Sequence, residues 1–194
     1  MTRRRPRAGG RAGTRRVASS ARRASAKPPR PTKGLVPRVG LGIDRHPFAP
    51  GRRLVLGGVV IPGANGLQGH SDADVLTHAI CDAILGALGL PDLGIRFPAS
   101  APRWRGRRSL FFLRDIVKAM RSRRYAIGNL DVVVLAEQPR LRPHLAPMRA
   151  VLARVIGCDP AQVSIKPKRG EGLGFVGRGE GIEVHAAVLL LASP

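Results

Sequence analysis

The stretch that decides the fold runs from residue 40 to residue 78 and contains two motifs. The first is Gly40-Leu41-Gly42-Ile43-Asp44-Arg45-His46, and the second is Gly69-His70-Ser71-Asp72-Ala73-Asp74-Val75-Leu76-Thr77-His78. If the first motif is a strand, Asp44 and His46 project from the same face, because successive side chains alternate. If the second is a helix, His70, Asp74 and His78 share one face, because they are spaced four residues apart.

These residue types suit a metal site. A carboxylate and an imidazole from the strand, with one imidazole from the helix, would give zinc three protein ligands and leave a fourth position open. The spacing leaves open which helix histidine is the ligand. A solvated strand edge followed by a polar helix start is the alternative, and it would be preferred for the Asp-x-His pair alone. The two motifs together favour the metal site.

The composition predicts one folded domain behind a basic segment. The 194 residues are 43% hydrophobic and carry a net charge of +22. The first 38 residues hold 13 Lys and Arg and no acidic residue, and the remainder holds 21 basic and 12 acidic residues. We expect residues 1–37 to be a disordered basic tail, because they offer almost nothing to bury, and residues 38–194 to be the domain. The positive excess in the domain suits an anionic ligand such as a phosphate ester.

The basic tail has three interpretations. An inert extension ranks first, and an organelle transit peptide ranks second because the segment is rich in Arg and Ser and lacks acids. A nucleic-acid-binding arm ranks last, since no aromatic residue is present to stack on a base. No apolar run is long enough to span a membrane, and two cysteines give no disulfide framework. We therefore expect a cytoplasmic protein, or a plastid protein if the tail is a transit peptide, with neither a membrane nor a nucleic acid as its favoured partner.

Strands and helices alternate along residues 38–194. Predicted strands cover 38–46, 129–137, 162–167 and 182–191, and 53–62 is a predicted hairpin whose Gly57-Gly58 turn needs positive φ angles. Residues 63–69 are a predicted loop. One helix, capped by Ser71 or Asp72, should run to about residue 88, a second, capped by Ser109, to about 121, and a third from about 143 to 156. The pattern predicts an α+β sandwich with a mixed four- to five-stranded sheet and helices on one face.

Two loops carry further candidate chemistry. Residues 170–181 include six glycines, whose unhindered N–H groups suit phosphate, and the same loop holds Glu171, Phe175 and Arg178. Arg178 could bind phosphate bidentately and Glu171 a divalent cation, although a flexible hairpin is the alternative. Residues 136–144 form a strand-to-helix loop stiffened by prolines. Such a loop can bind the edge of a small base, or it can be an ordinary connection.

Taken together, these segments resemble the 2-C-methyl-D-erythritol 2,4-cyclodiphosphate synthase family of the non-mevalonate isoprenoid pathway. The resemblance covers about Arg38 to the C-terminus. The motifs that carry it are residues 40–46, residues 69–78, Asp92-Leu93-Gly94, and residues 173–181. It implies a phosphorus-oxygen lyase that closes 4-diphosphocytidyl-2-C-methyl-D-erythritol 2-phosphate into the cyclodiphosphate and releases CMP. It also implies a homotrimer with the sheets facing the centre and three active sites at subunit interfaces.

The resemblance further implies roles for individual residues. Zinc, or another divalent cation, would be bound by Asp44, His46 and His78, while His70, a catalytic residue, and Ser71 would hold the attacking phosphate. Glu171, also catalytic, would manage the α- and β-phosphates with Mg²⁺ or Mn²⁺, and Asp92 would bind the erythritol hydroxyls. Residues 136–142 with Pro167 and Lys168 would line the cytosine pocket. The expected substrate-binding residues are Asp44, His46, His70, Ser71, Asp92, Leu93, Gly94, Phe97, Ala136, Pro139, Arg140, Leu141, Arg142, Lys168, Phe175 and Arg178.

Two segments depart from the family pattern. Ala99-Ser100-Ala101 stand where the family has Asp-Thr-Asp, so two carboxylates are missing from the loop that covers the substrate. Lys168-Arg169-Gly170 replace a threonine run, and Arg169 takes the place of a threonine that contacts the phosphates. We expect Arg169 to be a catalytic cation that neutralises phosphate charge. The alternative is a zinc-binding trimeric member of the family with lost or altered catalysis.

Overall fold

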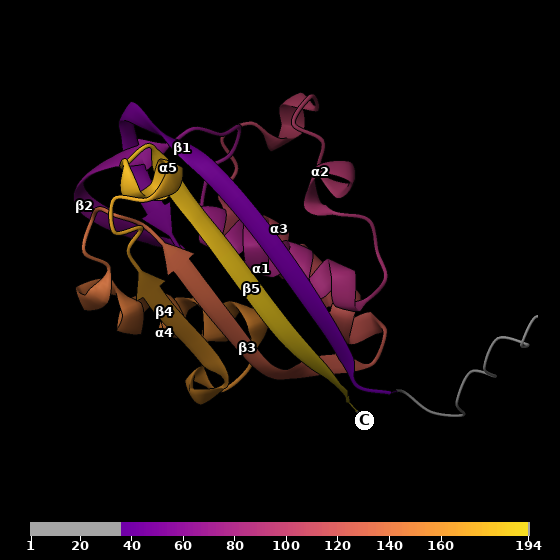
Figure 1. Ribbon diagram of the computed structural model, residues 1–194. Coiled ribbons are helices and arrows are strands. Elements are labelled where there is room, and N and C mark those ends of the chain that lie inside the picture. The colour runs from indigo at the N-terminus through magenta and orange to yellow at the C-terminus, as the bar shows by residue number, and fades with distance from the viewer. Residues whose placement is uncertain (1–35, 194) are drawn as a thin grey trace, which may run out of the picture. The chain divides into compact units, whose positions relative to one another are not determined.

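A five-stranded sheet in the order β2-β1-β5-β3-β4 forms the framework of the domain (Figure 1). The structure, a computed structural model, describes residues 36–193, so the predicted disordered tail lies almost entirely outside the described residues. Strands β1 (Arg38–Leu56) and β2 (Val59–Leu67) form an antiparallel hairpin at one edge. The turn between them contains Gly57 and Gly58 at φ 56° and 75°, as the sequence predicts.

The remaining strands make the sheet mixed. Strand β5 (Gly181–Ala192) pairs antiparallel with both β1 and β3 (Tyr125–Leu135), and β4 (Val163–Lys168) pairs parallel with β3. The helices are α1 (Val75–Ala87), α2 (Leu93–Arg96), α3 (Ser109–Ser122), α4 (Leu145–Ile156) and α5 (Gly174–Gly177), with 3-10 turns η1 (Pro102–Trp104), η2 (Arg142–His144) and η3 (Pro160–Gln162). Helices α1, α3 and α4 lie behind the sheet in Figure 1. The predicted α+β architecture with helices on one face is confirmed.

Two glycines bring α1 directly against β1. A side-chain carbon built on Gly40 or Gly42 would collide with main-chain carbonyl oxygens of α1, at Ala83 and Ala79 respectively. The absence of side chains therefore allows the helix axis to approach the strand closely. This contact fixes the first turn of α1, which carries His78, beside the end of the Gly40–His46 segment.

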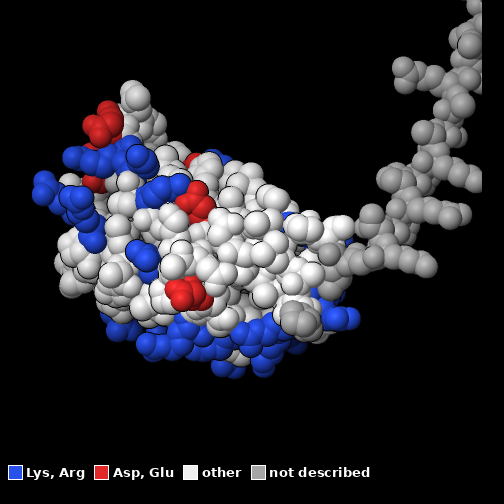
Figure 2. All heavy atoms as spheres, turned by 90° about the horizontal axis from the view of Figure 1, so that it is seen from below, with Lys and Arg blue, Asp and Glu red and all other residues white. Residues whose placement is uncertain are grey.

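The other face of the sheet is open and carries a strip of apolar side chains on β1. Along β5, Ile182, Val184, Ala186, Val188 and Leu190 are buried against the helices. Side chains of the opposite parity point away, and on β1 Val39, Leu41 and Ile43 are 75%, 63% and 44% exposed. The same face also carries two ion pairs, Arg45 with Glu183 at 3.7 Å and Lys166 with Asp131 at 2.6 Å. Figure 2 shows Lys and Arg gathered along one edge of the molecule, with other charged groups scattered over a largely uncharged surface. An exposed apolar strip of this kind suits contact with another protein surface.

Several predicted element boundaries are wrong. Strand β1 is continuous from 38 to 56, and β2 extends to Leu67, so most of the predicted 63–69 loop is strand, because Phe48 pairs with Leu67. Helix α1 is capped by Asp74, not by Ser71 or Asp72. Ser109 is the first residue of α3 and does not cap it. Strand β3 begins at Tyr125, four residues before the predicted start. None of the helices in residues 36–193 is long and apolar enough to cross a membrane.

Candidate active site

Asp44, His46 and His78 form a compact cluster between β1 and α1. One ligand atom from each residue lies within 4.8 Å of the other two. Oδ2 of Asp44 is 2.9 Å from Nε2 of His46 and 3.2 Å from Nδ1 of His78. Ligand atoms in a tetrahedral zinc site with bonds of about 2.0–2.1 Å are about 3.3 Å apart. The donor set and its spacing therefore fit a divalent metal with three protein ligands.

The ring of His46 is oriented for metal binding by the main chain. Its Nδ1 lies 2.5 Å from the carbonyl oxygen of Gln68, so Nδ1–H can donate to that oxygen. This tautomer leaves the Nε2 lone pair directed at the cluster. A histidine that binds a metal through one ring nitrogen usually donates the N–H of its other ring nitrogen to a carboxylate, a main-chain carbonyl or water.

A chain of polar side chains supports the ring of His78. Its Nε2 is 2.9 Å from Oγ of Ser109 and 3.3 Å from Oγ of Ser71. The Ser109 hydroxyl in turn donates to Asp72 Oδ1 at 2.5 Å, and the Ser109 main-chain N–H donates to the same oxygen at 2.9 Å. Ser109 and Asp72 were not expected at the site. In the sequence, each of these two residues stands near a predicted helix start, and a serine or aspartate at that position ordinarily indicates a cap.

Electrostatics couple the three cluster residues. Burial favours the neutral form of Asp44, but hydrogen bonds from His46 and His78 outweigh burial and hold the pKa of this carboxyl well below its usual range. Burial likewise opposes protonation of His46, but the hydrogen bond and negative charge of Asp44 raise the pKa of His46 above its ordinary value. The carboxylate is therefore ionised at neutral pH, as a metal ligand must be.

Asp74 is a structural residue and not part of the cluster. Its carboxylate is fully buried and accepts hydrogen bonds from the N–H groups of Gly57, Gly58 and Thr77 and from the Thr77 hydroxyl. Because α1 begins only at Val75, His70 lies in the preceding loop. The prediction that His70, Asp74 and His78 share one helix face is therefore wrong.

A cavity of about 180 Å³, here called the metal-side cavity, opens beside the cluster. Seven residues expected at the site line it: His46, His70, Ser71, His78, Leu93, Gly94 and Phe97. Gly69, Ala99, Trp104 and Phe112 complete the wall and were not expected. Phe97 packs on Trp104 and Phe112 with ring centroids 5.3 and 4.7 Å apart. The cavity therefore has a polar, metal-facing end and an aromatic end, which suits a small polyol phosphate.

A second cavity, of about 330 Å³, lies where β3 and β4 end and is here called the loop cavity. The expected residues Ala136, Pro139, Arg140, Leu141, Arg142, Pro167, Lys168 and Arg169 line it, together with Glu137 and Gln138. The guanidinium of Arg169 forms an ion pair with Glu137, whose other oxygen accepts from Gly170 N–H at 3.1 Å. Arg169 is therefore at the cavity but already has an anionic partner.

Besides Asp44, which lies in the metal cluster, four expected residues line neither cavity. Asp92 caps α2 by accepting from Ile95 N–H at 2.8 Å, and Glu171 is exposed on a turn at φ 50°. Phe175 contributes to a separate hollow with His46, and Arg178 pairs with Glu180 at 2.6 Å. The structure does not bring these four side chains to the metal-side cavity or the loop cavity.

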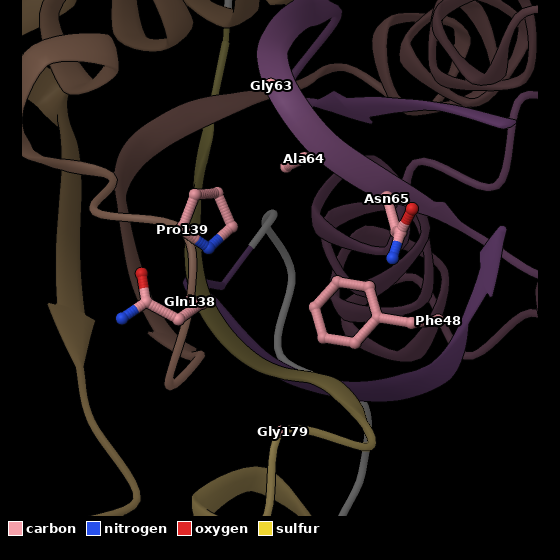
Figure 3. Close-up of a pocket in the computed structure, with 7 residues that line it drawn as sticks. All are labelled: Phe48, Gly63, Ala64, Asn65, Gln138, Pro139 and Gly179. Atoms are coloured by element: carbon pink, nitrogen blue, oxygen red, sulfur yellow. The ribbon is translucent and has the colours of Figure 1, made fainter. Parts of the chain in front are cut away.

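A third hollow, of about 390 Å³, lies between the β1–β2 hairpin and the 136–142 loop (Figure 3). Phe48 and Asn65 lie on one side of it and Pro139 lies opposite. Gln138 and Pro139 also line the loop cavity, while the side chain of Gln138 points away from Phe48 in this view. The 136–142 loop therefore contributes residues to both the third hollow and the loop cavity.

Known proteins provide a comparison for this arrangement. The model of the YgbB family matches residues 37–191. The chain belongs to the YgbB family. Its relatives include the 2-C-methyl-D-erythritol 2,4-cyclodiphosphate synthase of Synechococcus elongatus, 51% identical over 79% of this chain and 96% of that protein. The chloroplastic synthase of Arabidopsis thaliana is 43% identical over 84% of this chain and 70% of its own length.

The YgbB family match also extends to longer proteins and to solved structures. The bifunctional enzyme IspD/IspF of Anaeromyxobacter dehalogenans is 55% identical over 78% of this chain, which spans 39% of that protein's length. A solved 2C-methyl-D-erythritol-2,4-cyclodiphosphate synthase in a CDP-bound form has a TM-score of 0.74 and 36% identity, covering 79% of this chain and 100% of that one. These likenesses agree with the family to which the sequence motifs point.

Proposed function

We propose that this chain converts 4-diphosphocytidyl-2-C-methyl-D-erythritol 2-phosphate into 2-C-methyl-D-erythritol 2,4-cyclodiphosphate and CMP. The observation that carries the proposal is the Asp44, His46 and His78 cluster beside a cavity of polyol-phosphate size. The identity of 51% along nearly the whole Synechococcus elongatus synthase supports it. The activity belongs to the non-mevalonate route to isoprenoids.

The proposed reaction is an internal phosphoryl transfer. An oxygen of the 2-phosphate attacks the β-phosphorus, a new P–O–P bond closes the ring, and the bond between the β-phosphorus and the bridging oxygen breaks. That oxygen leaves with CMP. The nucleophile is already an anion, so the protein needs no strong base, and positioning with charge neutralisation accounts for the catalysis.

The metal-side cavity would hold the reacting phosphates. Asp44, His46 and His78 would bind a divalent metal, which zinc would fit, and when bound the metal would polarise the β-phosphate. His70 and Ser71 lie on the cavity wall, where they can donate hydrogen bonds to the 2-phosphate. Leu93, Gly94 and Phe97 would exclude water from the methylerythritol carbons.

The loop cavity would hold the cytidine end. Main-chain groups of residues 136–142 are suited to hydrogen-bond a base edge, and Lys168 offers a cation to the diphosphate. Glu171 would bind Mg²⁺ or Mn²⁺ together with the α- and β-phosphates. Arg169 would take part once the substrate's negative charge competes with Glu137 for the guanidinium. The CDP-bound form of a solved synthase supports a cytidine nucleotide as the ligand.

The assembly we propose is a homotrimer with the open sheet faces at its centre. Val39, Leu41 and Ile43 pair in register with Leu189, Ala187 and His185 across β1 and β5, and together they make an exposed strip of mainly apolar side chains. Burying such a strip against two copies of itself would remove it from water. In the trimer, the metal-side cavity of one subunit would face the loop cavity of the next.

The boundaries and location of the domain also remain proposals. Residues 38–194 would be the catalytic domain, and residues 1–37 would be a tail that the reaction does not need. A cytoplasmic location suits the two free thiols, Cys81 and Cys158. The chloroplastic relative supports a plastid as the alternative, if the tail is a transit peptide.

Turnover of the diphosphocytidyl substrate tests the proposal, with CMP release measured by chromatography. We expect CMP and the cyclodiphosphate in equal amounts, and no CMP from the His78→Ala variant. A parent chain that binds zinc but releases no CMP would refute the proposal. That result would favour a family member with lost catalysis, for which the Arg169–Glu137 pair is the specific structural argument.

A further inference from the structure

A run of arginines stands next to the metal-side cavity. Residues 103–108 read Arg-Trp-Arg-Gly-Arg-Arg, and no acidic residue occurs between Asp92 and Asp115. The side chains of Arg103, Arg105, Arg107 and Arg108 are all exposed. We call these four residues the arginine rim. It belongs neither to the metal cluster nor to the loop cavity.

The main chain fixes the arginine rim at the cavity. Gly106 N–H donates to the carbonyl oxygen of His70 at 2.8 Å, and the carbonyl oxygen of Arg107 accepts from Asp72 N–H at 3.2 Å. Trp104, within the run, lines the cavity itself. Immediately after the run, Ser109 contacts His78. The arginine rim is therefore tied to the loop that carries His70 and Ser71.

The rim carries positive charge that residues 36–193 leave unneutralised. The salt bridges to carboxylates in this part of the chain involve Arg45, Arg96, Lys166, Arg169 and Arg178, and none involves the rim. Arg103 lies over the Trp104 ring at 4.8 Å and Arg107 over the Phe111 ring at 5.2 Å. These contacts orient two guanidinium groups without cancelling their charge. Four like charges within six residues repel one another, so an anion would stabilise the run.

We propose that the arginine rim captures the phosphomonoester end of the substrate and guides it into the metal-side cavity. This proposal rests on the proposed function, whose substrate carries a diphosphate and a phosphomonoester of about −1.5 to −2 charge. Fixed cations at the mouth of a cavity raise the association rate of an anion by about 10- to 1,000-fold. The rim acts on encounter and binding, and it takes no part in bond making.

Steady-state kinetics separate capture from chemistry. Arg105→Gln/Arg108→Gln removes two rim charges and leaves both guanidinium–ring contacts in place. Arg114→Gln/Arg154→Gln removes the same charge from exposed positions on α3 and α4 and is the matched control. At low ionic strength we expect kcat/KM of the rim variant to fall about tenfold, with kcat within twofold of the parent. The difference should vanish near 1 M salt, where the screening length is about 3 Å.

Equal losses of kcat/KM in the rim and control variants would overturn the proposal, because they would assign the effect to net charge. A fall in kcat with an unchanged salt dependence of kcat/KM would also overturn it. The parent and the control should keep the steep salt dependence, and the rim variant should lose most of it.

A binding measurement makes the test independent of turnover. Trp104 is the one tryptophan of the chain, so its fluorescence reports on the rim. Titration with inorganic phosphate, which resembles the phosphomonoester, at constant ionic strength should give at least fivefold weaker binding in the rim variant than in the control. Equal binding in the two variants would refute the rim as an anion site. If the parent releases no CMP but binds inorganic phosphate through Arg105 and Arg108, the proposed function fails and the anion site remains. If the parent turns over and both variants behave alike, the function remains and the rim proposal fails.

Discussion

Replacing Asp74 by Asn should destabilise the domain strongly, because this one carboxylate ties the Gly57-Gly58 turn to the start of α1. Oδ1 accepts from Gly57 N–H at 2.9 Å and Thr77 N–H at 3.0 Å. Oδ2 accepts from Gly58 N–H at 2.7 Å and from the Thr77 hydroxyl at 2.6 Å. An asparagine side chain keeps one acceptor oxygen and places an NH₂ group where the other oxygen was. Gly58 N–H then faces a donor and loses its partner.

The magnitude follows from these contacts. At least one main-chain donor and one amide donor become buried without a partner, and each unsatisfied group costs about 1–3 kcal/mol. We therefore expect the free energy of unfolding to fall by about 2–6 kcal/mol. The midpoint of thermal unfolding falls about 2–4 °C for each kcal/mol in a domain of this size. Because Asp74 also caps α1, the first turn that carries His78 should loosen, and metal content should fall as well.

Urea unfolding followed by circular dichroism, at one fixed protein concentration, measures the change. Asp115→Asn is the matched control, since it makes the same chemical change at a half-exposed carboxylate paired with Arg96. A surface pair of this kind contributes about 0–1 kcal/mol. If Asp74→Asn unfolds within 1 kcal/mol of the parent, the four hydrogen bonds do not hold the hairpin turn and the helix together, and the reasoning is wrong.

Four further outcomes follow from the site and the sheet. Elemental analysis should find almost no zinc in His78→Ala and parent-like zinc in His70→Ala; the reverse would show that the ligand choice is wrong. Because Asp44 raises the pKa of His46, protons compete with the metal, and zinc retained after dialysis should fall as the pH is lowered, with the loss beginning above the ordinary histidine pKa of about 6.5. Leu41→Asp should convert a trimer into monomers in light scattering, and a monomeric parent at micromolar concentration would contradict the assembly. Arg169→Thr should raise the Mg²⁺ concentration needed for turnover without changing zinc content; superimposable titrations would mean that Glu137 holds the guanidinium away from the phosphates.

The sequence predicted the framework where local signals and tertiary contacts agree. The Gly57-Gly58 turn, the apolar stripe of α1 and the almost wholly apolar run of β5 all specify their structures locally. Boundaries failed where a distant segment decided them. Pro50 and Gly51 suggest a break after His46, but pairing of Phe48 with Leu67 carries β1 through it, with register shifts after Ala49. Irregular pairing of this kind leaves no period for the sequence to reveal.

The choice of helix cap failed for a related reason. Ser71, Asp72 and Asp74 are all good caps by residue type, and residue type alone cannot rank them. Asp74 caps α1 because its carboxylate also meets the Gly57-Gly58 turn, which is far away in the sequence. Asp72 is then free to accept from Ser109 and so supports His78. The support of the metal cluster could not be predicted, because it depends on where α3 begins.

The two departures from the family pattern change the charge of the site at one end only. At the loop cavity, Arg169 replaces a neutral threonine, but Glu137 pairs with it, so the local charge is nearly balanced. At the metal-side cavity, Ala99 and Ala101 remove two carboxylates, and the arginines at 103–108 follow with no acidic partner in residues 36–193. The uncompensated positive charge therefore lies beside the cavity in which we propose that the phosphomonoester end of the substrate binds.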